Sequence, residues 1–447
     1  MNDSMASRQD ETHLIDDARV SALAEEVLGW QHQAIPAQFH GQTVRQFRAA
    51  TPGLDQLQTP VLTLDREAMS GNLERFAQWC QQHGVLAAPH GKTTMAPALW
   101  QWQLEHGAWG ITLANAHQVR TARGFGLQRI MIANAVTDPQ AIAYLAAETI
   151  AGAEIYSWAD SVRTVELLSA ELAKTPGVTL PLIAELGASG GRTGARTDAE
   201  GLEIARAIAS AKQLRLVGVG GYEGSLAHTT DDSALAIIRD YLDRVGTLHR
   251  AALEEGLYET DTALLTAGGS AYFDNVVEQL STYTQEPGAG QPAVRVLLRS
   301  GAYLIHDDGF YRGISPLGRA NPDAETAFRA GMHAWVRVVS QPEPGLAILD
   351  AGKRDLPFDE GLPVVHGYAH ALGEELSELP EGEITAVNDQ HAFLRYAMDA
   401  ELNPGDVIRL GLSHPCTALD KWSLIPVLDS AQSPQTARVI DLVRTYF

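Results

Sequence analysis

One pattern recurs eight times along the middle of this chain: a short apolar segment, a loop and then an amphipathic helical stretch. Each apolar segment is bounded by turn residues and is expected to be a buried β-strand. The helical stretches between them include 199–211 and 233–255. Eight βα units in about 240 residues predict a closed (β/α)8 barrel of the TIM type, and an open doubly wound sheet is the alternative. The expected strands are 85–89, 110–114, 129–133, 153–158, 180–186, 214–222, 263–267 and 294–298.

The C-terminal part of the chain follows a different pattern. Its β-rich runs are separated by turn signals, and no long helical pattern lies between them. This predicts a mostly antiparallel β domain over 327–447, preceded by a barrel over 57–326 and an N-terminal extension over 1–56. The apolar segment near 61–65 can join either domain. The β-rich runs are 334–339, 345–349, 384–387 and 407–410.

Composition narrows the possible partners. The chain has 447 residues and a net charge of −22, so phosphate backbones and anionic membranes would be repelled. No apolar stretch reaches the roughly 18 residues of a membrane span, and Met1-Asn2-Asp3-Ser4 lacks the basic start of a signal peptide. With two cysteines, Cys80 and Cys416, no disulfide framework is expected. We therefore expect a cytoplasmic protein with a small-molecule substrate, without nucleic acid or membrane partners.

Lys92 lies just after the first expected barrel strand, in Pro89-His90-Gly91-Lys92-Thr93. Active sites of barrels form at the C-terminal ends of the strands. A lysine held there against apolar walls loses its proton more easily, and an unprotonated amine can form a Schiff base. A solvated loop lysine is the alternative when Lys92 is considered alone.

Other polar and glycine residues follow later strands in the same way. Arg192 follows the fifth strand, Tyr222 closes the sixth, and Gly268-Gly269-Ser270 follows the seventh. Glycine loops after strands seven and eight often bind phosphate in barrels, although this triplet is also common in plain turns. Together with Lys92, these residues describe a pyridoxal phosphate site. The lysine would hold the aldehyde, the glycine loop the phosphate and the arginine the ring nitrogen.

His414-Pro415-Cys416 follows the expected strand that ends at Leu412. If the extended conformation continues, the imidazole and the thiolate point to the same side and can share one ion. A His/Cys pair favours zinc among the common metals. A chance match is the alternative for such a short motif, and water and substrate would have to complete the ligand shell.

These motifs, in this order, resemble the D-serine dehydratase and D-threonine aldolase family, which has an alanine racemase-like fold. The resemblance covers roughly residues 57–447 and rests on Pro89-His90-Gly91-Lys92-Thr93, the loop from Arg192 to Gly194, Tyr222-Glu223-Gly224, Gly268-Gly269-Ser270 and His414-x-Cys416. It implies that Lys92 is the Schiff-base lysine, that Arg192 faces the pyridine nitrogen and that Tyr222 lies beside the cofactor. It also implies that His414 and Cys416 bind a divalent metal, that His228 takes part in aldolase chemistry and that the protein is a homodimer.

The resemblance implies a lyase dependent on pyridoxal phosphate and a divalent metal. The first expectation is dehydration and deamination of a D-serine-like substrate to a 2-keto acid and ammonia, because eliminating members carry cysteine as second metal ligand and aldolases carry aspartate. The second is retro-aldol cleavage to glycine and an aldehyde, with His228 as the base. An amino-acid racemase and a non-catalytic protein that binds pyridoxal phosphate are further alternatives. The sequence does not choose among D-serine, D-threonine and 3-hydroxyaspartate as the substrate.

Overall fold

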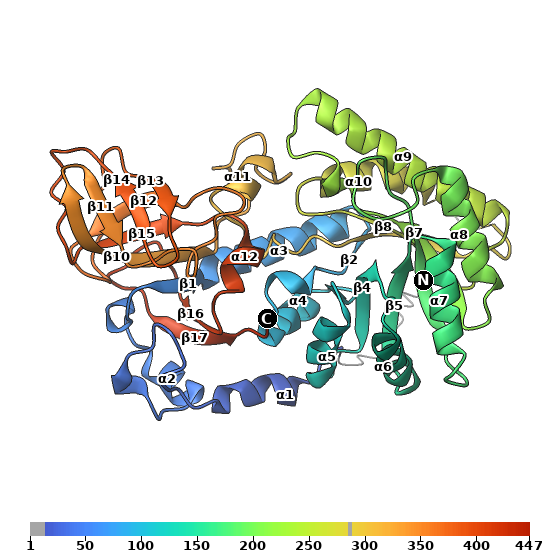
Figure 1. Ribbon diagram of the computed structural model, residues 1–447, viewed down its shortest axis with the longest axis horizontal. Coiled ribbons are helices and arrows are strands. Elements are labelled where there is room, and N and C mark those ends of the chain that lie inside the picture. The colour runs from blue at the N-terminus through green and yellow to red at the C-terminus, as the bar shows by residue number, and fades with distance from the viewer. Residues whose placement is uncertain (1–13, 285–287) are drawn as a thin grey trace, which may run out of the picture.

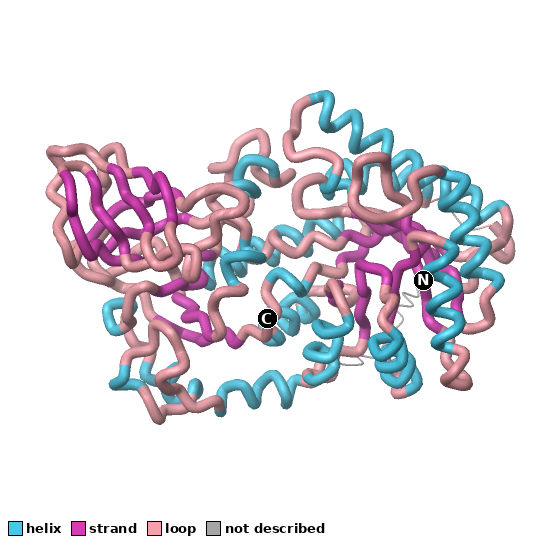
Figure 2. Tube along the Cα trace, in the orientation of Figure 1, coloured by secondary structure: helices cyan, strands magenta, loops and turns pink. Residues whose placement is uncertain are grey.

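The computed structural model describes residues 14–284 and 288–447 of the chain, in which two groups of strands lie side by side (Figures 1 and 2). The expectation about Met1-Asn2-Asp3-Ser4 falls outside the described residues. Within them, no helix is both long and apolar enough to cross a membrane. One strand group is wrapped by long helices, and the other lies among loops and short helices (Figure 2).

The first group is the barrel. Its strands are parallel, in the order β2-β9-β8-β7-β6-β5-β4-β3. A parallel bridge between His90 and Thr112 joins its two ends, and the Trp109 N–H donates to the Ala87 carbonyl at 2.7 Å. The predicted barrel is therefore confirmed over the open sheet. Its strands are β2 Leu86–Ala87, β3 Ile111–Leu113, β4 Arg129–Ala135, β5 Glu154–Ala159, β6 Leu180–Glu185, β7 Leu214–Gly220, β8 Thr262–Ala267 and β9 Ala293–Leu298.

Among the described residues, six of the eight helices around the barrel begin at a side-chain N-cap. A side-chain oxygen that accepts a hydrogen bond from the first helical turn stabilises a helix by about 1 kcal/mol. Such caps are Asp65, Asn115, Asp138, Ser161, Thr197 and Asp231. The helices around the barrel are α3 Arg66–Gln82, α4 Pro97–Glu105, α5 Ala116–Gly124, α6 Pro139–Ile150, α7 Val162–Leu172, α8 Asp198–Ser210, α9 Asp232–Glu254 and α10 Phe273–Leu280.

The second group is a nine-stranded, mostly antiparallel sheet, as predicted, in which β1 and β16 form a parallel pair. The segment near 61–65 forms β1 and pairs with β10, so it belongs to this sheet and not to the barrel. The division into 1–56, 57–326 and 327–447 stays a prediction. The strands are β1 Val61–Asp65, β10 Met332–Glu343, β11 Leu346–Leu349, β12 Val364–Ala369, β13 Glu383–Val387, β14 Ala392–Arg395, β15 Val407–Gly411, β16 Leu424–Leu428 and β17 Val439–Arg444.

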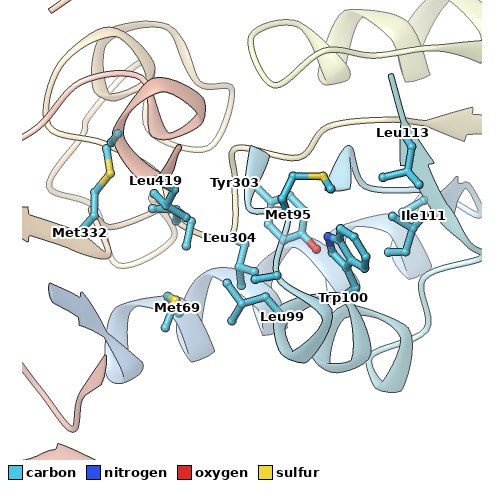
Figure 3. Close-up of a cluster of buried hydrophobic side chains, with 14 of the residues drawn as sticks. Met69, Met95, Leu99, Trp100, Ile111, Leu113, Tyr303, Leu304, Met332 and Leu419 are labelled. Carbon is cyan, nitrogen blue, oxygen red and sulfur yellow. The ribbon is translucent and has the colours of Figure 1, made fainter. Parts of the chain in front are cut away.

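A continuous apolar core connects the two groups of strands. Figure 3 shows part of it, where Leu419 from the short helix α12 (Pro415–Leu419) lies near Leu304 and Met332. On the barrel side, Trp100 and Ile111 lie next to each other in the same view. The core fixes α12 against the 3-10 turn η4 (Gly91–Thr93), which carries Lys92. Apolar packing thus brings together two segments that are more than three hundred residues apart.

The segment before β1 also contacts both groups. In the described residues before α2 (Val44–Ala50) it forms three short helices, α1 (Asp17–Ser21), η1 (Ala22–Glu25) and η2 (Ala37–Phe39). The Gln128 N–H donates to the Leu14 carbonyl on the barrel side. On the other side, Gly53 forms an antiparallel bridge with Arg438. The segment therefore spans from the barrel to the β domain (Figure 1).

Candidate active site

A cavity of about 330 Å³ opens at the C-terminal ends of the barrel strands, against α12 and the short helix α11 (Phe310–Ile314). It has room for a small molecule but not for a polymer. Nearly all residues that the sequence singled out line this cavity. They are Lys92, Arg192, Tyr222, Gly268, Gly269, Ser270, His414 and Cys416.

Lys92 reaches the cavity from η4, and close packing fixes this turn. The Trp100 Nε1–H donates to the Gly91 carbonyl at 3.1 Å. A Cβ at Gly91 would lie 2.6 Å from Ile111 Cγ2, so any larger residue would force the neighbouring side chains to shift. Burial lowers the pKa of Lys92; Cys416 opposes this, while Arg192 and Arg299 add to it. At neutral pH a larger fraction of this amine is therefore uncharged than in a solvated lysine.

Arg192 and Tyr222 contact each other at the cavity wall. The guanidinium carbon of Arg192 lies 4.9 Å from the centre of the Tyr222 ring, a cation–π arrangement. Burial, together with nearby Glu223, raises the pKa of Tyr222 to about 12. The Tyr222 phenol thus stays neutral and can donate a hydrogen bond to a ligand.

The glycine loop has a partner that the sequence did not indicate. The buried carboxylate of Glu223 accepts the Gly268 N–H at 3.0 Å and the Gly269 N–H at 2.7 Å. These two N–H groups, which were expected to bind phosphate, therefore already have an acceptor. Ser270, also on the cavity wall, is the residue of this loop whose hydroxyl can turn toward a ligand.

His414 and Cys416 come together by a route other than the expected one. The extended conformation predicted for them is wrong: His414 has φ 49° and is the N-cap of α12, and Pro415 is the first helical residue. Proline suits that position because it needs no N–H partner there. The Sγ of Cys416 lies within hydrogen-bonding distance of Thr93 Oγ1, at 3.3 Å, next to Lys92.

The pKa of the His414 imidazole is raised and that of the Cys416 thiol is lowered, because each side chain favours the charged form of the other. Burial lowers the pKa of His414, but the hydrogen bonds and charges of Cys416 and Asp359 outweigh it and raise the pKa to about 9. Burial raises the pKa of Cys416, but His414, Thr93 and Lys92 more than offset this and lower it. A thiolate is favoured at this position, which is the form of cysteine that binds metals.

His228 is the one predicted site residue that lies elsewhere. Its side chain is exposed, in the loop between η5 (Glu223–Ser225) and α9. It is not among the described residues that line the cavity. Its predicted role in aldolase chemistry stays untested.

Several cavity residues were not singled out from the sequence. Arg299 directly follows β9, and its guanidinium donates to the Gly221 carbonyl at 2.7 Å and lies 4.6 Å from the Trp158 ring. The strand-end rule that selected Lys92 would also have found Arg299. His90 and Tyr311 also line the cavity. Burial, and then the charges of Lys92, Arg299 and Arg192, keep the pKa of His90 well below its usual value.

A second group of metal-binding side chains lies outside the cavity. Ligand atoms of Asp308, His333 and His366 are within 4.8 Å of one another. However, Arg409 Nη2 lies 2.8 Å from His333 Nε2. Because arginine can only donate, Nε2 is the acceptor and Nδ1 carries the proton. His333 therefore has no lone pair free for a metal in this arrangement.

The donor set of the cavity fits both pyridoxal phosphate and a divalent ion. The buried His90 Nδ1 and Trp158 Nε1 atoms, on residues that line the cavity, have no hydrogen-bond partner among the described residues. Buried polar atoms without a partner are rare unless a ligand or water satisfies them. An uncharged lysine amine suits an aldehyde, and a thiolate with an imidazole suits zinc.

The chain is similar in sequence to several known proteins. A family model described as "Putative serine dehydratase domain" matches residues 331–428. The chain is 27% identical to D-threonine aldolase of Arthrobacter sp over 368 residues, 82% of this chain and 88% of that protein. It is 28% identical to 3-hydroxy-D-aspartate aldolase of Paracoccus denitrificans (strain Pd 1222) over 381 residues, 82% of this chain and 90% of that protein.

Solved structures share the fold over most of the chain. D-threonine aldolase from Filomicrobium marinum superposes with a TM-score of 0.71 at 23% identity, covering 88% of this chain and 96% of that one. D-threo-3-hydroxyaspartate dehydratase from Delftia sp. HT23 gives 0.69 at 20% identity, over 88% and 99%. An alanine racemase-like protein from Idiomarina loihiensis gives 0.67 at 16% identity, over 88% and 98%. The chain is therefore similar over most of its length to D-threonine aldolase and 3-hydroxy-D-aspartate aldolase, and it has an alanine racemase-like fold.

Proposed function

We propose that this protein is a lyase dependent on pyridoxal phosphate and a divalent metal that acts on D-3-hydroxy amino acids, with dehydration of a D-serine-like substrate to a 2-keto acid and ammonia as its reaction. Its homologues are named aldolases and dehydratases, so the enzyme class is that of a lyase, as expected from the sequence. The observation that carries the proposal is the cavity that Lys92 shares with His414 and Cys416. One amine and one pair of metal-binding side chains thus face the same small volume.

In this proposal, Lys92 holds the cofactor and later moves the proton at the substrate Cα. Its lowered pKa suits both tasks, because the amine must be uncharged to act as nucleophile or base. Bound pyridoxal phosphate would supply the electron sink. Arg192 and Tyr222 would hold its ring and Ser270 its phosphate, and Gly268 and Gly269 shape that loop around Glu223.

His414 and Cys416 would hold the metal, and zinc is the ion we propose. A bound divalent ion would act as a Lewis acid at the substrate hydroxyl. A structurally similar D-threo-3-hydroxyaspartate dehydratase has been solved as a variant without one cysteine in its metal-free form, which supports a cysteine ligand. Cys416 also lies beside Thr93, so the ion would be close to the amine of Lys92.

Retro-aldol cleavage to glycine and an aldehyde is the second candidate function. Three of the curated relatives are named aldolases, at 27% to 28% identity. This reaction needs a base at the substrate hydroxyl. His228, the candidate for this base, is exposed and does not line the cavity. Its position therefore favours elimination over cleavage. An amino-acid racemase has less support, because the relatives are named aldolases and dehydratases, which cleave a bond of Cβ.

Product analysis tests the proposal. The purified protein, supplied with pyridoxal phosphate and Zn²⁺, is incubated with D-serine, D-threonine and 3-hydroxy-D-aspartate, with and without a chelator. Ammonia with a keto acid supports elimination, and glycine with an aldehyde supports cleavage. Full activity after verified removal of the metal would contradict the metal role. A homodimer and a cytoplasmic location remain predictions that sedimentation and cell fractionation can test.

A further inference from the structure

Asp307 is a buried carboxylate behind the cavity wall, bonded to the backbone of two residues that line it, Tyr311 and His414. Only 1% of the residue is exposed. Its Oδ1 accepts the Tyr311 N–H at 2.8 Å and the Gly309 N–H at 3.1 Å, and its Oδ2 accepts the His414 N–H at 2.9 Å. Burying a carboxylate is costly unless its oxygens are satisfied. Here the satisfied oxygens join the segment that carries Tyr311 to the turn that carries His414.

The bond to the His414 N–H is important because the backbone there is in an unfavourable conformation. His414 has φ 49° and ψ 83°, in the left-handed region that favours glycine. A residue keeps such a conformation only when its surroundings hold it. Asp307 holds the N–H of His414, and the following Pro415 starts α12.

A second carboxylate fixes the ring of the same histidine. Asp359 Oδ2 lies 2.6 Å from His414 Nδ1, and Asp359 Oδ1 accepts the Thr417 hydroxyl at 2.6 Å. An ionised carboxylate can only accept, so Nδ1 carries a proton. Nε2 is then the nitrogen that remains to bind an ion.

We infer that Asp307 and Asp359 are positioning residues that hold His414 by its backbone and by its ring, so that Nε2 and the Cys416 thiolate meet at one point for a divalent cation. This inference rests on the proposed function, in which His414 and Cys416 bind the metal. Histidines that ligate metals generally donate their other ring N–H to a carboxylate or carbonyl, and removing that partner weakens metal binding about 10- to 100-fold. Asp307 would also set the position of Tyr311 relative to the ion.

Binding of Co²⁺ tests the inference without reference to turnover. Co²⁺ bound to a thiolate absorbs in the near ultraviolet and visible, and its dissociation constant follows from competition with a chelator. Asp359→Ala should weaken Co²⁺ binding about 10- to 100-fold. Asp359→Asn, whose amide oxygen can still accept from Nδ1, should recover part of the affinity. Asp399→Ala, at an exposed carboxylate of the β domain, is the matched control and should bind as the wild type does.

Asp307→Asn keeps one acceptor oxygen and replaces the other with a donor, so it should weaken Co²⁺ binding as well. If this variant does not fold, the Asp359 variants still test the inference. The Asp359 side chain is 40% exposed, so its replacement should leave the fold intact. Wild-type affinity in both Asp359→Ala and Asp307→Asn, with the thiolate band lost in Cys416→Ala, would overturn the positioning roles and leave the metal site intact. An unchanged Co²⁺ spectrum in Cys416→Ala would instead overturn the proposed metal site.

Discussion

The two halves of the cavity hold their functional side chains by different means. Near Lys92, Met95 has φ 40° and is 1% exposed, inside the apolar core of Figure 3. At the start of α12, which packs against η4, His414 has φ 49° and is held by carboxylates. Both are left-handed residues other than glycine, but the Met95 side chain packs in the apolar core, whereas the His414 ring and N–H are bonded to carboxylates. The barrel half should therefore be sensitive to changes in volume, and the α12 half to the loss of single polar atoms.

The largest effect on activity should come from a substitution of Lys92, in the barrel half of the cavity. Lys92→Ala removes the amine, so turnover should fall at least about 10³-fold and the absorbance of lysine-bound cofactor should disappear. Lys174→Ala, at an exposed lysine paired with Glu171, is the control. If Lys92→Ala kept both signals, the amine of the site would have to be another one.

Adding a single methyl group at Gly91 should test how tightly the barrel half is packed. The Cβ of Gly91→Ala would lie 2.6 Å from Ile111 Cγ2 and 2.7 Å from Trp100 Nε1, so unfolding in urea should show a loss of about 1–3 kcal/mol. Gly124→Ala, at the end of α5, meets no atom within 4 Å and should change stability little. Equal effects of the two substitutions would show that η4 is not tightly packed.

Glu223→Gln tests whether hydrogen bonds also matter within the barrel half. Glutamine can accept only one of the N–H groups of Gly268 and Gly269, so the glycine loop should loosen. We expect the dissociation constant of pyridoxal phosphate to rise about tenfold, because one buried N–H loses its acceptor. Fluorescence titration of the apoprotein measures it. An unchanged constant would mean that the loop is held by packing alone, as η4 is.

The rate of cofactor binding should depend on pH through Lys92. Burial disfavours the charged amine, so the pKa in the folded apoprotein lies below the usual value of 10.5. The uncharged form then appears at lower pH than in a free lysine, and the rate of imine formation should reach its midpoint below 10.5. Stopped-flow absorbance between pH 7 and 11 would measure it. A midpoint at or above 10.5 would show that the cavity does not desolvate this amine.

His228→Ala should have the smallest effect. The side chain is exposed and outside the cavity, so elimination should proceed at a rate within about twofold of the wild type, as for ordinary surface substitutions. Product analysis with D-threonine is the informative measurement. Selective loss of glycine and aldehyde in this variant would support the retro-aldol alternative.

The fold could be predicted from the sequence because its signals are local. Each barrel strand is a short apolar run, and α8 and α9 follow helical spacing within one or two residues of the expected bounds. Barrel geometry then brings residues such as Lys92 and Arg192 to one face, since strand ends converge there. The strand β1 was ambiguous because its five residues are all buried, which suits either sheet.

The remaining parts of the site depend on partners distant in sequence. Glu223 bonds to N–H groups 45 and 46 residues away, and Asp307 to one 107 residues away. No local pattern marks such a carboxylate. The conformation of His414 was missed for a different reason: Pro415 is a typical first residue of a helix, but the preceding strand made an extended continuation the simpler expectation.

The contact between β2 and β3, which closes the barrel, should respond to a bound ligand. β2 contains two residues, and its link to β3 is made by a single bridge at His90 and by a few hydrogen bonds. Lys92 follows that bridge by two residues. A molecule bound to Lys92 and to groups on the later strands would link the two ends of the barrel sheet across the cavity. The amides of Trp109 and Thr112 should then exchange with solvent more slowly when the cavity is filled, so the ligand would complete the barrel's closure.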